Sequence, residues 1–288
     1  MKKTYKKVYL EITNCCNLSC SFCAKMQREA AFLSKERFET LLSAVAPYAQ
    51  RIYPHILGEP LLHPDFKDFL TVCEKYGKQV FVTTNGTLLG EKGSVLLKSP
   101  AVKKVSVSLH CFEDNFPNSD PSAYLREVLD FARLAEKCGI AVELRLWNTN
   151  QTGAVNQTLL DRIAQELVPD EEVLHAIRHL QNTKVSLKIS LSFAEQFSWE
   201  TDEEQGEGFL CYGLRDQFGI LVDGTVVPCC MDAGGQIRLG NIYTQTLQEI
   251  LDSKRATQLY EGFSSRRTSE KLCARCGYAR RFYKKKSL

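Results

Sequence analysis

Hydrophobic positions in the first two-thirds of the chain alternate between two spacings. Short β-branched runs such as VKKVSVSL and KQVFVTT come close to the continuous apolar pattern of strands covered on both faces of a parallel sheet. Between these runs the apolar residues recur at helical spacing, as in Leu125, Leu129, Phe131, Leu134 and Ala135. The pattern therefore predicts strands that alternate with amphipathic helices.

Six strands and five helices are expected in this part. Ser34 is placed to cap the first helix, and Gly77 and Gly139 lie where two later helices should end. Such an alternation favours an α/β fold, a parallel sheet with right-handed crossovers that is open or curved toward a barrel. The predicted strands are 7–13, 51–57, 79–84, 104–109, 141–147 and 184–192, and the predicted helices are 34–48, 65–76, 88–98, 122–138 and 156–168.

The character of the sequence changes near residue 200. The acidic, glycine-punctuated segment 200–208 predicts a linker or exposed loop. Beyond it, Asp223-Gly224 separates two strand-like runs at 217–222 and 225–228, which predicts a β-hairpin. A short strand at 236–239 and a helix at 246–260 follow. We therefore expect a domain at 1–200 and a small α+β domain at 201–288.

Composition narrows the function classes. A chain of 288 residues with a net charge of +3 can bury a core and is neither a polycation nor an acidic disordered chain. No apolar run is long enough to span a bilayer, and Glu11 interrupts the apolar stretch near the N-terminus, so we expect a cytoplasmic protein without a signal peptide. In a reducing compartment, 12 cysteines favour metal ligation or redox chemistry over a disulfide scaffold.

Three of these cysteines form a C-x3-C-x2-C motif directly after the first predicted strand. Cys16, Cys20 and Cys23, with no fourth thiolate close by, suit a cubane iron–sulfur cluster that leaves one iron open. A structural zinc site requires four ligands and fits less well. Cys15 is the alternative fourth ligand, but neighbouring side chains on an extended segment point in opposite directions, so we expect it to face the core.

This motif resembles the signature of the radical S-adenosylmethionine (radical SAM) superfamily. The resemblance implies a partial (β/α)6 TIM-like barrel, S-adenosylmethionine bound to the open iron, and a 5′-deoxyadenosyl radical that abstracts hydrogen from a substrate. It also implies that Phe22 lies near the adenine. Leu57-Gly58-Glu59-Pro60 is similar to the family's Gly-Gly-Glu motif, with Leu57 in place of the first glycine, and implies that Gly58 and Glu59 meet the methionine amino group.

Further positions match the family at the ends of later strands. Asn85 lies in Thr83-Thr84-Asn85-Gly86, and Ser108 and His110 follow the fourth strand, where relatives contact the ribose or carboxylate. Relatives often have an aspartate where this chain has His110. Arg145 on the fifth strand is open to two interpretations, a contact with the methionine carboxylate or an ion pair inside the barrel.

A second cysteine group lies near the C-terminus. With Gly224 five positions before Cys229, it resembles the start of the SPASM extension of radical SAM enzymes, and no cysteine follows Cys276. The match to the shortened "twitch" version implies one auxiliary 4Fe–4S cluster that stabilises a module too small for a large core. Two alternatives are a zinc ribbon and ligation by Cys230 in place of Cys229. The implied ligands are Cys211, Cys229, Cys273 and Cys276.

The remaining cysteines and two of the histidines are not expected to bind a metal. Cys73, Cys111 and Cys138 are expected to be small core residues. His175 and His179 share one helix face without partners at metal-ligand spacing. No motif identifies a catalytic acid or base.

Together these features predict a radical SAM oxidoreductase or maturase with two 4Fe–4S clusters and S-adenosylmethionine. A cluster with four cysteine ligands exchanges electrons, so a net oxidation of a sugar-like alcohol or peptide side chain is expected. The expected partners are that substrate and an electron donor such as flavodoxin or ferredoxin. The alternatives are a non-enzymatic iron–sulfur or zinc module that contacts RNA through the basic tail, and a radical SAM enzyme that modifies RNA. Few aromatic residues accompany that tail, which disfavours nucleic acid.

Overall fold

The computed structural model describes residues 3–24, 28–150, 157–167, 170–201 and 211–282. In these ranges the strands form one sheet of ten, in the order β10-β9-β8-β1-β2-β3-β4-β5-β7-β6. The strands are β1 (Lys7–Leu10), β2 (Arg51–Tyr53), β3 (Gln79–Thr84), β4 (Val102–Ser108), β5 (Ala141–Leu146), β6 (Thr183–Lys184), β7 (Ile189–Phe193), β8 (Gln217–Ile220), β9 (Thr225–Val227) and β10 (Gly240–Asn241).

The strands β1 to β5 and β7 pair in parallel, which confirms the predicted partial barrel. Along β5 the side chains alternate, with Val142, Leu144 and Leu146 buried and Glu143 and Arg145 partly accessible. This period of two directs the apolar side chains toward the covering helices and the polar ones toward the inside of the curved sheet. The interior of the partial barrel is therefore polar enough to hold a reaction site.

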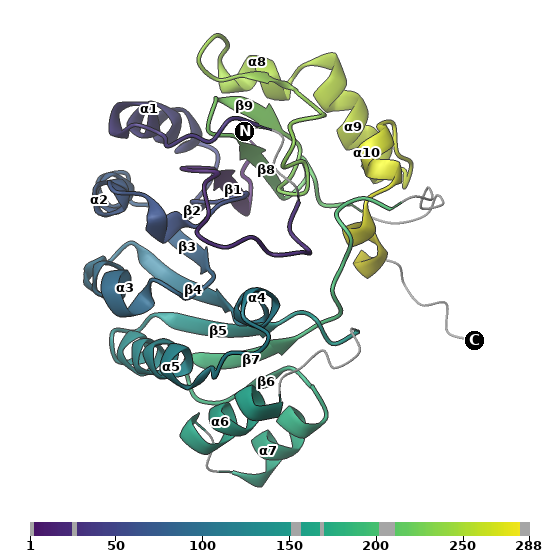
Figure 1. The fold of residues 1–288 in the computed structure, drawn as a ribbon. Coiled ribbons are helices and arrows are strands. Elements are labelled where there is room, and N and C mark those ends of the chain that lie inside the picture. The colour runs from purple at the N-terminus through teal and green to yellow at the C-terminus, as the bar shows by residue number, and fades with distance from the viewer. Residues whose placement is uncertain (1–2, 25–27, 151–156, 168–169, 202–210, 283–288) are drawn as a thin grey trace.

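Helices cover the outer face of the sheet, as Figure 1 shows for α1, α2, α3 and α5, whereas α4 lies on the inner side. Ser34 caps α1 by accepting a hydrogen bond from the Arg37 N–H at 3.3 Å, as predicted. The helices are α1 (Lys35–Val45), α2 (Phe66–Lys75), α3 (Leu89–Lys98), α4 (His110–Asn115), α5 (Ser122–Lys137), α6 (Gln157–Leu167), α7 (Glu171–Arg178), α8 (Leu247–Leu251), α9 (Lys254–Ser264) and α10 (Lys271–Ala274), with 3₁₀ turns η1 (Pro60–Leu62) and η2 (Gly277–Phe282).

The predicted sixth strand is two strands. Instead of one run over 184–192, β6 turns back antiparallel onto β7. Ser186 forms this turn, because its hydroxyl accepts from the Ile189 N–H at 3.1 Å and donates to Glu136 Oε1 at 2.6 Å. A polar residue in the middle of the predicted run thus reverses the chain.

The C-terminal hairpin extends the barrel sheet, because β8 pairs in parallel with β1. The strand predicted at 236–239 is wrong, since the Gln236 and Ile237 N–H groups donate to the Asp232 carboxylate at 2.7 and 2.8 Å and pairing begins at β10. The helix predicted at 246–260 is divided into α8 and α9, because Ser253 caps α9. The predicted domain boundary stays a prediction, and most of the predicted linker lies outside the described residues.

Among the described residues no helix combines the length and the apolar character that crossing a bilayer requires.

Candidate cluster and cofactor site

A cavity of about 550 Å³ opens at the carboxyl ends of the first four strands. The loop after β1 forms one wall and brings Cys16, Cys20 and Cys23 to the same cavity. Parallel α/β folds place their chemistry at this end of the sheet. The segments after β2, β3 and β4 complete the cavity, as the order of the motifs predicts.

The chemistry of three thiolates on one cavity wall is compatible with a cluster. Among the described residues, no three Cys, His, Asp or Glu side chains converge closely enough to hold one ion. A zinc ion draws its thiolates to one point at about 2.3 Å, whereas a cubane offers a separate iron to each thiolate. Cys15 is not part of the cavity wall, and its sulfur lies 3.9 Å from the Ala31 carbonyl oxygen.

Glu59 is buried at the base of the cavity. Its carboxylate accepts hydrogen bonds from the Leu61 N–H at 3.1 Å, the Thr84 hydroxyl at 2.8 Å and the Asn85 N–H at 2.7 Å. Burial nevertheless raises the pKa of Glu59 to about 7, despite these donors. A cationic group such as an ammonium would restore the ionised form.

Gly58 allows the chain to pass close to the cysteine loop. Its φ is +78°, and a Cβ atom at this position would lie 2.5 Å from the Thr13 carbonyl oxygen and 2.8 Å from that of Cys15. The next residue, Glu59, donates its N–H to the same Cys15 oxygen at 2.8 Å. Only glycine fits such a close approach in this conformation, which gives the Gly-Glu motif a structural reason.

Asn85 joins the third strand to the cysteine loop. Its Nδ2 donates to Asn17 Oδ1 at 2.9 Å and lies 3.8 Å from the Cys16 sulfur. The Tyr124 hydroxyl, buried behind it, donates to the Asn85 carbonyl oxygen at 2.8 Å. Asn85 therefore stands beside the first cysteine, where the sequence motif places it.

Two of the predicted cofactor contacts, His110 and Arg145, do not line the cavity. The other five do line it: Phe22, Gly58, Glu59, Asn85 and Ser108. The His110 ring packs behind Phe22 with centroids 5.1 Å apart, and its Nδ1 lies 3.1 Å from the Arg145 carbonyl oxygen. Arg145 donates to Glu143 at 2.6 Å and stacks on Trp147 at 4.6 Å. Its ion pair agrees with the second of the two interpretations left open for Arg145.

His55 was not singled out by any motif, yet it lines the cavity. Its ring meets those of Tyr9 and Tyr53 edge to face, with centroids 5.8 and 6.1 Å apart. Within the described part of the chain, its buried Nδ1 has no hydrogen-bond partner. Burial, and secondarily the charge of Arg145, lowers the pKa of His55 to about 3, so the imidazole is neutral.

The second cysteine group gathers beyond the hairpin. Burial raises the pKa of the Cys229 thiol, and so do the neighbouring thiols of Cys230, Cys211, Cys273 and Cys276. The four predicted ligands are thus close enough to interact electrostatically. Because metal ligation requires thiolates, cluster binding here must displace protons that burial holds on the sulfurs.

Cys230 is close to the predicted ligands and also has contacts of its own. It packs against the cluster that contains Tyr9 and Leu57, and its sulfur hydrogen-bonds with the Tyr9 hydroxyl. The choice of Cys229 over Cys230 as the ligand stays a prediction.

A strap at 197–201 connects the two cysteine sites. Trp199 lines the cavity and donates from Nε1 to the Phe22 carbonyl oxygen at 3.0 Å. The next residue, Glu200, forms a β-bridge with Cys276, and the Thr201 N–H donates to the Arg275 carbonyl oxygen at 2.8 Å. Consecutive residues of the strap therefore touch the walls of both sites.

The remaining cysteines differ in how far they match the expected core positions. Cys73 is buried as expected, but Cys138 is exposed at the end of α5, where the helix leaves it uncovered. Cys111 is partly buried and hydrogen-bonds to Cys20, so it is more than a core residue. His175 and His179 stack at 4.0 Å on α7.

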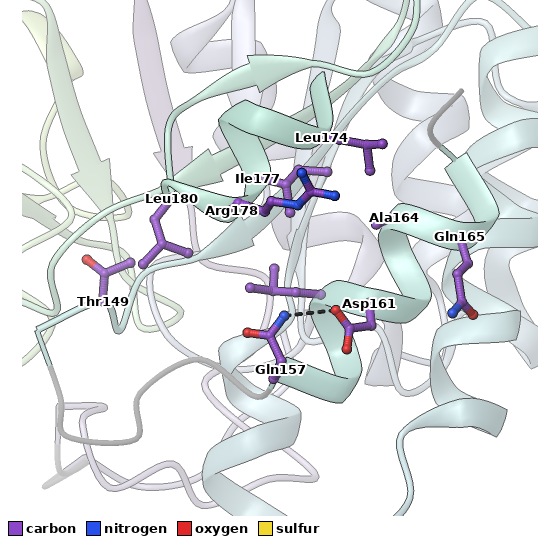
Figure 2. Close-up of a pocket in the computed structure, with 10 residues that line it drawn as sticks. Thr149, Gln157, Asp161, Ala164, Gln165, Leu174, Ile177, Arg178 and Leu180 are labelled. Atoms are coloured by element: carbon purple, nitrogen blue, oxygen red, sulfur yellow. Dashed lines mark hydrogen bonds between the residues drawn. The ribbon is translucent and has the colours of Figure 1, made fainter. Parts of the chain in front are cut away.

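A separate groove of about 480 Å³ lies between α6 and α7 (Figure 2). Gln157 donates to Asp161 at 2.8 Å on one side of it, and Arg178 lies on the other. No predicted site residue lines this groove.

Comparisons with known proteins agree with this arrangement. The profile of the Radical SAM superfamily matches residues 10–151, and that of the SPASM iron–sulfur cluster-binding domain matches residues 211–277. A GTP 3′,8-cyclase of Aquifex aeolicus (strain VF5) is 27% identical over 199 residues, which cover 66% of this chain and 57% of that protein. A tungsten-containing aldehyde ferredoxin oxidoreductase cofactor-modifying protein of Pyrococcus furiosus is 36% identical over 91 residues, 30% of this chain and 26% of that protein. The matches thus span less than two-thirds of these relatives' length.

Solved structures share the fold over most of the chain. BtrN in complex with AdoMet and 2-DOIA has a TM-score of 0.53 and 16% identity, and the match covers 92% of this chain and 89% of BtrN. Streptococcus suis SuiB bound to S-adenosylmethionine has a TM-score of 0.63 and 18% identity, with 96% and 72% covered. The chain is an enzyme of the radical SAM superfamily, in which an S-adenosylmethionine-binding 4Fe–4S domain is followed by a C-terminal domain for an auxiliary iron–sulfur cluster.

Proposed function

We propose that this enzyme is an oxidoreductase or maturase that oxidises a C–H bond of a sugar-like alcohol or a peptide side chain. The observation that carries the proposal is the single cavity lined both by the first cysteine trio and by Trp199 of the strap that pairs with Cys276. A substrate in this cavity would lie beside the first cysteine trio and against the strap that leads to the second site. That arrangement suits removal of a hydrogen atom on one side and an electron on the other.

The proposed residue roles come from the resemblance to the superfamily, and the lining of the cavity supports those at the first cluster. Cys16, Cys20 and Cys23 hold the first cluster, and Glu59 binds the methionine amino group while Phe22 lies along the adenine. The second cluster is held by Cys211, Cys229, Cys273 and Cys276. When bound, the cofactors supply a 5′-deoxyadenosyl radical that takes one hydrogen atom and an acceptor for the remaining electron.

Atom balance then requires the substrate to lose a proton as well, so that the product is lighter by two hydrogens. A hydroxyl or N–H group on the oxidised carbon supplies this proton and leaves a C=O or C=N bond. An electron donor such as flavodoxin or ferredoxin supplies the electron for each cleavage of S-adenosylmethionine.

His55 lines the cavity and is a candidate to orient such a substrate. Its ring is held edge-on by Tyr9 and Tyr53, and a neutral imidazole accepts a hydrogen bond from a hydroxyl or an N–H group. The fold shared with BtrN and SuiB supports this range of substrates, since one is crystallised with 2-DOIA and the other with the precursor peptide SuiA.

The test is an anaerobic assay of the reconstituted, reduced protein with S-adenosylmethionine and a metabolite and peptide extract. We expect 5′-deoxyadenosine, and a product two hydrogens lighter than a compound of the extract. The matched variant Cys16→Ala should form neither. Absence of 5′-deoxyadenosine from the fully loaded protein would favour the binding-module alternative, and a modified RNA nucleotide as the product would favour the RNA-modifying one.

A further inference from the structure

The short helix α4 clamps the loop that carries the first cysteine trio. At its C-terminal end, the Asp114 carboxylate accepts from the Ser21 N–H at 2.6 Å and the Ser21 hydroxyl at 2.5 Å. Asn115 Oδ1 accepts from the Ser19 N–H at 2.8 Å. Two consecutive residues of α4 thus fix the backbone on both sides of Cys20.

Asn115 also reaches the sulfur itself. Its Nδ2 donates to the Cys20 sulfur at 3.1 Å and to the Cys111 carbonyl oxygen at 2.8 Å. The orientation of the amide is fixed, because a flipped amide would turn its oxygen toward that carbonyl and its nitrogen toward the Ser19 donor. The N–H group is therefore held against Cys20 by the rest of the network.

The three cysteines differ in the donors that reach them. Cys20 receives the amide of Asn115 and hydrogen-bonds with the thiol of Cys111, which lines the same cavity. Cys16 receives the Leu18 N–H at 3.4 Å and a distant Asn85 amide at 3.8 Å. Cys23 receives a backbone donor from Ala24. Hydrogen bonding from side chains is thus concentrated on the middle cysteine.

We propose that Asn115, assisted by Cys111, is a positioning residue that sets the reduction potential of the first cluster through its hydrogen bond to Cys20. The inference rests on the proposed assignment of Cys20 as a ligand. Hydrogen bonds to cluster sulfurs stabilise the reduced form, which carries one more negative charge, and so make reduction easier. The sequence of α4 therefore determines how strong an electron donor the enzyme needs.

The test is a redox titration of the full-length, fully loaded protein, followed through the EPR signal that S-adenosylmethionine perturbs. We expect Asn115→Leu to shift the reduction equilibrium roughly tenfold toward the oxidised cluster, a midpoint potential lower by about 59 mV. The control Asp114→Ala removes a loop anchor that touches no sulfur. It should lower the iron retained without moving the potential.

A second pair of variants keeps the proposal testable if Asn115→Leu fails to load a cluster. Cys111→Ala should lower the potential, whereas Cys111→Ser keeps a donor and should stay close to the unsubstituted protein. An unchanged potential in both Asn115→Leu and Cys111→Ala would overturn the inference while leaving the ligand assignment intact. An equal shift in Asp114→Ala would also overturn it, since loop position would then be the cause. A signal that does not respond to S-adenosylmethionine in the unsubstituted protein would instead refute the ligand assignment.

Discussion

Glu59 links the second and third strands at the base of the cavity. Three donors converge on its carboxylate and favour the ionised form, while burial favours the protonated form. Burial dominates and the pKa rises to about 7. The carboxyl group is therefore close to half-ionised at neutral pH until a cation reaches it.

This pKa predicts a pH dependence for S-adenosylmethionine binding to the cluster-loaded protein. If the methionine amino group binds only to the ionised form of Glu59, the affinity should fall by about tenfold for each pH unit below 7, and Glu59 should contribute no further change well above pH 7. Calorimetric titration between pH 5.5 and 8.5 measures this. In Glu59→Gln the drop attributable to this group should disappear, and an unchanged pH profile in that variant would exclude Glu59 as the titrating group.

Individual site residues can be located from the sequence where their chemistry depends on a fixed spacing. The cysteine trio and Gly58-Glu59 could be located from sequence alone, because a cluster loop and a close backbone approach restrict residue type at fixed positions. Asn115 and His55 could not be found in this way. Their roles depend on which side chains the fold brings to Cys20 and to the cavity, and no local pattern records that.

Among the elements, the strap at 197–201 is the physical connection between the two sites. Gly277 follows Cys276 directly, and a Cβ at this position would overlap the Ser198 carbonyl oxygen. Trp199, one residue further along the strap, contacts Phe22 beside the first cysteine group. A displacement of the strap at Gly277 should therefore change the packing at both cysteine sites.

We accordingly predict that Gly277→Ala destabilises the protein by about 1–3 kcal/mol, the cost of forcing extra atoms into a packed site. Chemical unfolding measures the loss, and iron analysis should show poorer retention of the auxiliary cluster. Gly234→Ala is the matched control, since a Cβ there meets only Gln236 Cγ at 3.9 Å. Equal free energies of unfolding for the two variants would show that the strap can shift to admit the extra methyl group without loss of stability.

Elements were predicted well where periodicity extends over many residues. The five long helices and the parallel strands follow from their spacing, but α4 has six residues and too few turns to show a helical period. The strands predicted at 7–13 and 51–57 are shorter than expected, at Lys7–Leu10 and Arg51–Tyr53. Side-chain hydrogen bonds account for three further errors: Ser186 divides the sixth strand, Asp232 occupies the donors of the predicted strand at 236–239, and Ser253 restarts the last long helix.

For the whole molecule, the parallel pairing of β8 with β1 attaches the auxiliary site to the barrel. The second cysteine group is thereby connected to the barrel, and Cys230 packs against the cluster that contains Tyr9 of β1. This geometry suits electron exchange with a substrate more than a detached structural module would.

Cys276→Ala should separate the roles of the two sites. We expect it to retain about four irons per chain and to cleave S-adenosylmethionine, but to lose formation of the oxidised product. The melting temperature should also fall, because cluster binding stabilises the folded C-terminal region. Product formation at the unsubstituted rate would show that the auxiliary cluster has at most a structural role.

The most direct measurement of the central claim is the EPR spectrum of the reduced protein with and without S-adenosylmethionine, recorded in a variant with Cys211, Cys229, Cys273 and Cys276 all replaced by alanine. Only the cluster at Cys16, Cys20 and Cys23 would then remain. We expect a 4Fe–4S signal that changes when S-adenosylmethionine is added, because the cofactor binds the iron without a cysteine ligand. A signal that is present and does not change would contradict it.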